Sequence, residues 1–147
     1  MADKHVSQAF ADALLAVEKQ RVDEKVWEYP AHGTSVQIPL QSTDLKEEFV
    51  LDVKRYRIDL VRRTFQNRGR VSLILARVDL RGPSHDNPDG TEVPPPHIHL
   101  YREGYGDKWA FPLPDVFSNP EDTERTLLDF MGYCNITLPP RMQQGWV

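Results

Sequence analysis

The sequence predicts an α+β fold, in which a single domain over residues 1–147 holds a mainly antiparallel, twisted sheet of about five to seven strands with a helix packed on it from each end of the chain. Three observations support this prediction. An apolar helical stripe opens the chain, a series of alternating runs follows, and a second helical segment comes near the end. A chain of 147 residues is long enough to bury one core and short for two.

The opening helix is predicted over about residues 6–21. Phe10, Leu14 and Val17 lie on one helical stripe, and the alanines around them are strong helix formers. We expect this helix to pack its apolar stripe on the sheet.

The predicted sheet covers about residues 26–114. Its first clear strand signal is TSVQIPLQST, in which Val36, Ile38 and Leu40 alternate with polar residues. Three further strands are predicted from EFVLDV, YRIDLVRRTFQ and RVSLILARVDL, with a hairpin turn at NRG, residues 67–69. The third of these runs is the most continuously apolar, which favours a central position in the sheet. HIHLYRE and DKWAFPL predict the last two strands.

The closing helix is predicted over about residues 120–133, from the run SNPEDTERTLLDFMGYCN. Ser118 or Asn119 can cap its first turn, and Pro120 suits the first helical position. The acids that follow complement the positive end of the helix dipole.

Composition limits the kind of protein. Charged residues make up 27% and apolar residues 39%, which is typical of a globular chain. No run of about 18 apolar residues and no signal or transit pattern occurs, so we expect a cytoplasmic protein with no membrane partner. Cys134 is the single cysteine and lies at helical spacing from Leu127 and Met131, so we expect a core residue and neither an internal disulfide nor a catalytic thiol.

Charge is distributed unevenly. The net charge of −4 argues against a protein that coats nucleic acid non-specifically, but the segment from Lys54 to Arg70 carries a single acid, Asp59, among many cations. Two interpretations stay open: a solvated sheet face whose arginines pair with acids elsewhere, and a strip that binds phosphates. The cations of this segment are Lys54, Arg55, Arg57, Arg62, Arg63, Arg68 and Arg70.

The run HIHLYRE concentrates polar chemistry on one strand. If Ile98 and Leu100 point to the core, the other face carries the candidate catalytic row His97, His99, Tyr101 and Glu103. Two imidazoles on one face can act as base and acid in phosphodiester cleavage. They can also bind a metal, for which the candidate ligands are His85, His97, His99 and Glu103. A third interpretation is that the histidines only donate hydrogen bonds to loop carbonyls.

Further candidate groups follow within ten positions. Arg102 is a candidate to steady added charge, and Tyr105 and Lys108 are candidates for substrate binding, as is His85 from the preceding loop. Trp109 and Phe111 are expected in the core rather than as platforms for base stacking.

Residues 49–136 resemble a family of small uncharacterised bacterial and prophage proteins. The motifs are a Gly-Pro-x-His-x-Asn-Pro-Asp-Gly loop and then His-x-His-x-Tyr-Arg-Glu-Gly-Tyr-x-Asp-Lys-Trp-Ala. The resemblance implies a mobile-element or defence context. The chain is also similar, more weakly, to small toxins of toxin–antitoxin pairs that carry a basic sheet and a His-x-His strand. HIHLYRE further resembles the first metal motif of a cupin barrel, but no histidine follows His99 to supply the second.

Three functional hypotheses result. The first is a metal-independent ribonuclease, plausibly a toxin, in which Arg55, Arg57, Arg62, Arg63 and Lys108 hold phosphates while His97 and His99 transfer protons. The second is a non-enzymatic module that binds nucleic acid or protein through the same surface. The third is an enzyme with a histidine-ligated metal. No cofactor is expected under the first two, and the expected partners are RNA, a cognate antitoxin or another protein, with a homodimer as a further expectation.

Overall fold

The computed structural model describes residues 6–143 and shows a single domain made mostly of strands. These residues form twelve strands and two helices, and the main sheet has eight strands in the order β10-β9-β6-β5-β4-β3-β1-β11. The predicted α+β fold is therefore corrected to a mostly-strand fold with a mixed sheet, whose eight strands are close to the five to seven expected. Its extra strands come from segments beyond the expected sheet limits, at both ends of the chain.

The N-terminal helix is shorter than predicted because the chain turns into a strand. Helix α1 covers Gln8–Ala16, and the Ser7 side chain caps it by accepting a hydrogen bond from the Phe10 N–H. Strand β1 follows at Lys19–Arg21 and pairs in parallel with β11, Ile136–Leu138. This parallel pair closes the far edge of the sheet and makes it mixed.

The middle of the sheet is an antiparallel meander, as expected, with different strand limits. The predicted strand YRIDLVRRTFQ is divided, because residues 56–62 form the turn between β4 and β5. The predicted turn at residues 67–69 lies inside the β5 ladder, and the chain reverses at Arg70 and Val71, both with positive φ. The four strands are β3 (Ser35–Ser42), β4 (Glu48–Arg55), β5 (Arg63–Gly69) and β6 (Leu73–Asp79).

The GPSHDNPDG loop forms a small hairpin that packs on the other edge of the sheet. Asn87 pairs with the edge strand β10: its side-chain amide donates to the Ala110 carbonyl at 3.0 Å and accepts from the Ala110 N–H at 2.8 Å. The loop is thereby fixed beside β9 and β10. The remaining strands are β7 (His85–Asp86), β8 (Glu92–Val93), β9 (His97–Arg102), β10 (Gly106–Pro112), β2 (Val26–Trp27) and β12 (Arg141–Met142).

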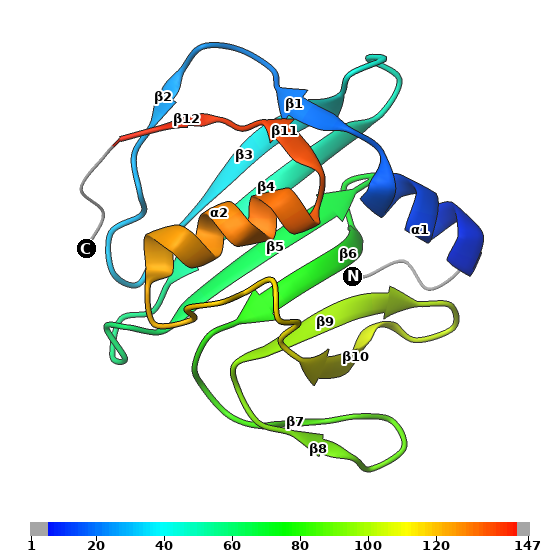
Figure 1. Ribbon diagram of the computed structural model, residues 1–147, viewed down its shortest axis with the longest axis vertical. Helices are drawn as coiled ribbons and strands as arrows, with labels where there is room; N and C mark the ends of the chain where they lie inside the picture. The colour runs from blue at the N-terminus through cyan, green and yellow to red at the C-terminus, as the bar shows by residue number, and fades with distance from the viewer. Residues whose placement is uncertain (1–5, 144–147) are drawn as a thin grey trace.

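Helix α2, Thr123–Tyr133, lies across the sheet in Figure 1, on the face that also carries the core. Its cap is Asp122, which accepts from the Arg125 N–H, rather than the predicted Ser118 or Asn119. Cys134 is fully buried in this core as expected, and burial raises the pKa of its thiol to about 12. Neither helix of residues 6–143 is long and apolar enough to cross a membrane.

Lys19 is a fully buried cation that the sequence analysis did not anticipate. Its ammonium donates hydrogen bonds to the carbonyls of Leu15, Val17 and Cys134 at 2.7, 3.0 and 2.7 Å. These carbonyls lie near the ends of α1 and α2, where helical partners are missing. Lys19 therefore joins both helix ends to β1.

Candidate functional site

Strand register gathers a polar cluster on the face of the sheet away from the helices. In the β6–β9 pair, Asp79 lies opposite His97 and Arg77 lies opposite His99. In the β5–β6 pair, Thr64 lies opposite Asp79. Because facing residues of antiparallel strands have neighbouring side chains, three strands bring their polar side chains to one place.

Three imidazole rings meet in this cluster. The centroids of His97 and His99 are 5.0 Å apart, and the His85 ring lies 4.5 Å from His99 and 6.2 Å from His97. The β7–β8 hairpin brings His85 there, and its Nε2 donates to the Lys108 carbonyl at 2.6 Å. The predicted convergence of His97 and His99 is thus present, with His85 beside them.

The hydrogen bonds of the two buried histidines orient their rings. His97 Nδ1 lies 3.1 Å from the Val93 carbonyl oxygen, and His99 Nδ1 lies 2.8 Å from the Asp107 carbonyl oxygen. A carbonyl oxygen accepts only, so each Nδ1 carries the hydrogen. In the neutral ring the lone pair is then on Nε2, whereas in the protonated ring Nε2 carries a second hydrogen and donates it. Both Nε2 atoms face the carboxylate of Asp79, which accepts from the protonated rings.

Asp79 is at the centre of the cluster. Its Oδ2 lies 3.2 Å from His97 Nε2 and 3.3 Å from His99 Nε2, while its Oδ1 accepts from the Thr64 hydroxyl at 2.8 Å. Burial by itself would raise the pKa of the Asp79 carboxyl. The hydrogen bonds to the two histidines, with the charge of Arg77, outweigh burial and hold that pKa well below its usual range. Asp79 is therefore an anion at neutral pH.

Arg77 supplies positive charge beside this anion. Its guanidinium lies 3.3 Å from Asp79 Oδ2, donates to His99 Nε2 at 2.9 Å, and is 3.2 Å from Asp107 Oδ2. The side chain therefore has two sets of partners: the cluster itself and a carboxylate at its border.

A cavity of about 440 Å³ opens over the cluster. This volume is in the range of about 300–1,000 Å³ that is usual for small-molecule sites. His97 and His99 are 2% and 1% exposed, so they form its floor, while its rim carries polar side chains. Side chains that line it include Asp52, Lys54, Tyr56, Arg62, Thr64, Gln66, Arg77, Asp79, Arg81, His85, His97 and His99.

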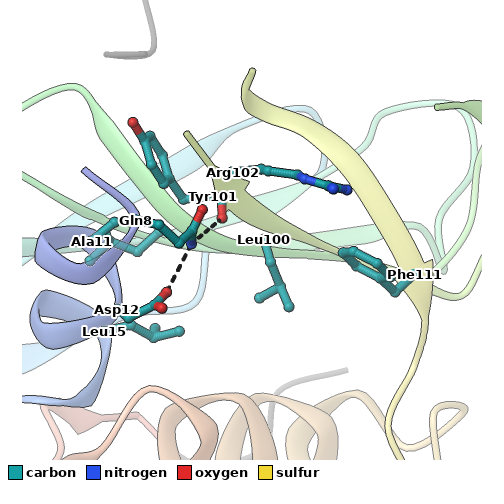
Figure 2. Close-up of a pocket in the computed structure, with 9 residues that line it drawn as sticks. Gln8, Ala11, Asp12, Leu15, Leu100, Tyr101, Arg102 and Phe111 are labelled. Carbon is teal, nitrogen blue, oxygen red and sulfur yellow. Dashed lines mark hydrogen bonds between the residues drawn. The ribbon is translucent and has the colours of Figure 1, made fainter. Parts of the chain in front are cut away.

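Three of the predicted catalytic residues contact other parts of the chain. Tyr101 is buried and its hydroxyl donates to the Val6 carbonyl at 2.7 Å, and Glu103 accepts from the Gln8 N–H at 2.7 Å. The guanidinium of Arg102 lies 4.4 Å from the centroid of the Trp109 ring. Figure 2 shows Tyr101 and Arg102 beside Gln8, at a separate pocket next to α1. Tyr101 and Glu103 therefore hold the N-terminal segment against β9, while Arg102 packs on β10.

The predicted substrate-binding residues are also divided by the fold. Arg55 and Arg63 are buried and donate to backbone carbonyls of Pro30 and Leu60. Of the four arginines proposed for this role, Arg62 lines the cavity described above and Arg55, Arg57 and Arg63 do not. The phosphate-binding strip, one of the two interpretations of residues 54–70, is therefore not formed as one surface, because residues 56–62 form a turn that leaves Arg55 and Arg63 buried and Arg62 at the cavity.

Tyr105 lies in the turn before β10 and Lys108 lies within β10, and both side chains are exposed. Tyr105 packs against Trp109 with ring centroids 5.8 Å apart, and Lys108 contributes its backbone carbonyl to His85. The structure connects Lys108 to the cluster through this carbonyl and not through its ammonium.

The central carboxylate, Asp79, was missed by the sequence analysis, as was Arg77. Both lie in RVSLILARVDL, which was noted for its apolar residues. A signal was present: Arg77 and Asp79 are two apart, so they share a face of a strand that is otherwise apolar. Polar residues at that spacing in a central strand indicate a buried polar site.

Asp79, His97 and His99 are also a candidate metal-binding group. Each offers one ligand atom, and the three atoms lie within 4.8 Å of one another. Of the ligands considered from the sequence, His97 and His99 are in this group, while Glu103 and His85 are not; Asp79 from β6 is the third member. Two histidines and a carboxylate form a donor set that suits zinc and other divalent transition metals.

Comparison with known proteins gives a family and no function. The model of a family of unknown function (DUF6978) matches residues 6–136. No curated protein and no solved structure matches the chain. Conclusions about activity therefore depend on the cluster and its cavity.

Proposed function

The chain belongs to this family of unknown function, and we propose that it is a metal-dependent hydrolase whose metal is held by His97, His99 and Asp79. The observation that carries the proposal is the spacing of the ligand atoms. Asp79 Oδ2 lies 3.2 and 3.3 Å from the two Nε2 atoms. Ligands of a tetrahedral zinc, about 2.0–2.1 Å from the metal, lie about 3.3 Å from one another.

The orientation of the rings supports the same proposal. Metal-binding histidines usually donate their other ring N–H to a carbonyl or carboxylate, which fixes the lone pair toward the metal. His97 and His99 both do so, through Val93 and Asp107. Two lone pairs and a carboxylate oxygen that face one another repel unless a proton or a cation lies among them. Arg77 supplies one positive charge at the side of the cluster, and a divalent metal would supply charge to all three atoms.

The proposed metal has a competitor in Arg77. Because its guanidinium donates to His99 Nε2, it must release that nitrogen before a metal takes it. Asp107 offers the released guanidinium a partner at 3.2 Å, so Arg77 need not leave the border of the cluster. Such a rearrangement moves one side chain and no backbone.

Three protein ligands leave a fourth position open, as in catalytic zinc sites. A metal there supplies a Lewis acid and lowers the pKa of a bound water to about 7. The protein's residues would do the rest: Asp79 and the histidines would fix the position, and Thr64 orients Asp79. His85, whose ring lies 4.5 Å from that of His99, is the candidate proton acceptor.

The metal-independent ribonuclease proposal places a different demand on the same atoms. It requires the Nε2 atoms of His97 and His99 to reach an RNA phosphate and the neighbouring hydroxyl. Both atoms instead face Asp79, within hydrogen-bonding distance of its carboxylate. The metal-dependent proposal uses the rings in the positions they have, which is why we prefer it.

Zinc binding tests the proposal directly. Protein treated with a chelator and then dialysed against Zn²⁺ is expected to retain one zinc per chain, while His97→Gln and His99→Gln retain none at the same free concentration. His32→Gln is the matched control, since His32 contacts Arg55 outside the cluster. Fe²⁺ and Mn²⁺ are tested in parallel because the donor set also suits them. If wild type and both histidine variants bind zinc equally, the proposal is refuted.

Turnover separates an enzyme from a binding module. The zinc-loaded protein is expected to hydrolyse a chromogenic ester, and both histidine variants are expected to lose this activity. Stoichiometric zinc without hydrolysis of any ester would favour the non-enzymatic alternative.

We also propose a bacterial mobile-element or defence origin, with RNA and a cognate antitoxin as candidate partners. Support comes from the resemblance of the GPSHDNPDG loop and the HIHLYREGYGDKWA segment to small prophage proteins. A small companion reading frame beside the gene, whose product binds this chain in a pull-down of purified proteins, is the expected result. No companion frame beside related genes would contradict it.

A further inference from the structure

Two cations at the rim of the cavity, Lys54 and Arg62, form no direct ion pair with a carboxylate of residues 6–143. Asp59, which pairs directly with Arg81, is the acid whose pKa the charge of Arg62 helps to lower. The neighbouring arginines differ from these two cations: Arg68 pairs with Asp52 and Arg81 pairs with Asp59, each at 2.8 or 2.9 Å. Four cationic and two anionic side chains line the cavity altogether, so it carries excess positive charge.

Arg62 is held in position by its surroundings. Its guanidinium carbon lies 3.8 Å from the centroid of the Tyr56 ring. On another side Gly82, with φ of +113°, packs so closely that a Cβ on it would lie 2.7 Å from the guanidinium. Lys54 also contacts the Tyr56 ring, with Nζ 4.7 Å from its centroid. Packing against an aromatic ring positions these cations without neutralising them.

We infer that the substrate of this site is a phosphate ester whose anionic oxygens bind Arg62 and Lys54. The inference rests on the proposed metal-dependent hydrolase. A phosphoryl group has enough oxygens to bind the metal and two separate cations at once, and the planar guanidinium fork matches two of its oxygens. A carboxylic ester is uncharged and has no anionic oxygen for the two cations to bind.

Hydrolysis then follows ordinary phosphoryl-transfer chemistry. The oxygen of a water molecule bonds to phosphorus, the bond from phosphorus to the leaving alcohol oxygen breaks, and a proton from the water ends on that alcohol. Arg62 and Lys54 stabilise the negative charge on the non-bridging oxygens during this step. No oxidant or further reactant is needed.

Phosphate binding tests the inference without any metal. Inorganic phosphate is titrated calorimetrically into chelator-treated wild type, Arg62→Gln and the matched control Arg70→Gln, in which Arg70 pairs with Glu47 outside the cavity. Loss of one charge-assisted contact is expected to weaken binding by Arg62→Gln about 10- to 100-fold, with the control unchanged. Gly82→Ala, which displaces the guanidinium but keeps its charge, is expected to weaken binding as well. Equal affinity in wild type and Arg62→Gln overturns the inference.

Turnover distinguishes the sources of the phosphate ester. Zinc-loaded protein is given bis(p-nitrophenyl) phosphate, p-nitrophenyl phosphate and p-nitrophenyl acetate. Faster cleavage of the diester points to a nucleic-acid backbone, and faster cleavage of the monoester points to a small phosphorylated molecule. Either rate is expected to fall at least 10-fold in Arg62→Gln. If only p-nitrophenyl acetate is hydrolysed, the phosphate-ester inference is refuted and the metal-dependent hydrolase is supported. If the protein does not bind zinc, the proposed hydrolase is refuted instead.

Discussion

Replacing Asp79 by Asn tests the proposed ligand group most sharply. The substitution keeps the size of the side chain and its place on β6, but removes the negative charge and the anionic ligand atom. A protein that binds a metal only when folded is stabilised by it, so the metal raises the melting temperature of wild type. In Asp79→Asn two histidines remain, and this rise is expected to be much smaller.

The magnitude follows from binding linkage. At a free zinc concentration about 100 times the dissociation constant, wild type gains about 2.7 kcal/mol. For a chain of 147 residues that energy corresponds to a rise in Tm of about 5–10 °C. If the loss of Asp79 weakens binding about 100-fold, the gain falls to about 0.4 kcal/mol and the rise to about 1 °C.

Thermal unfolding monitored by fluorescence measures both quantities, with each variant scanned with zinc and with chelator. The difference between the two scans is compared rather than the melting temperature itself. This is necessary because Asp79→Asn also loses an anion that contacts Thr64 and His97, which lowers the melting temperature without metal.

Asp52→Asn is the matched control. Asp52 lines the same cavity, but its carboxylate pairs with Arg68 and accepts from Gln66. Its variant is expected to keep the full zinc-dependent rise. The reasoning is refuted if Asp79→Asn keeps that rise too, or if zinc, Fe²⁺ and Mn²⁺ all leave the melting temperature of wild type unchanged.

Three further predictions address the competing cation, the β5–β6 turn and a buried lysine. Arg77→Met is expected to tighten zinc binding about 10-fold, because a positive charge close to the metal position is removed; weaker binding in a competition titration would contradict this. Val71→Gly is expected to raise the free energy of unfolding by about 0.5–1 kcal/mol, because Val71 is 80% exposed and its φ of 67° suits glycine. Urea unfolding measures this free energy, and a variant less stable than wild type would contradict the prediction. Burial lowers the pKa of Lys19 from 10.5 to about 8, so between these values the unfolded chain binds more protons. The stability of wild type relative to Lys19→Met should therefore increase by about 2–3 kcal/mol from pH 8 to pH 10.5 and be lost as pH falls through 8; a flat or falling difference in urea unfolding would show that the sign is wrong.

The sequence by itself determined the local features of the candidate site. Alternation along HIHLYRE put His97 and His99 on one face, with Ile98 in the core, because strand side chains alternate by covalent geometry. The same reasoning failed for Tyr101 and Glu103, where the strand is ending and the N-terminal helix competes for contacts. Local pattern also indicated both helices and the buried state of Cys134.

Tertiary structure alone decided which distant residues meet. Asp79 is a ligand candidate because β6 pairs with β9 in one particular register, and a shift of that register by one residue would turn it to the other face. Arg55 and Arg62 look alike in sequence, yet the turn at residues 56–62 leaves one buried among carbonyls and the other at the cavity. Likewise, β1 and β11 are far apart in sequence and become neighbours only in the folded chain, which is why the sheet has strands outside its predicted limits. The alternation of apolar and polar residues in the sequence indicates which way each side chain points, whereas the pairing between strands is set by the packing of the whole core.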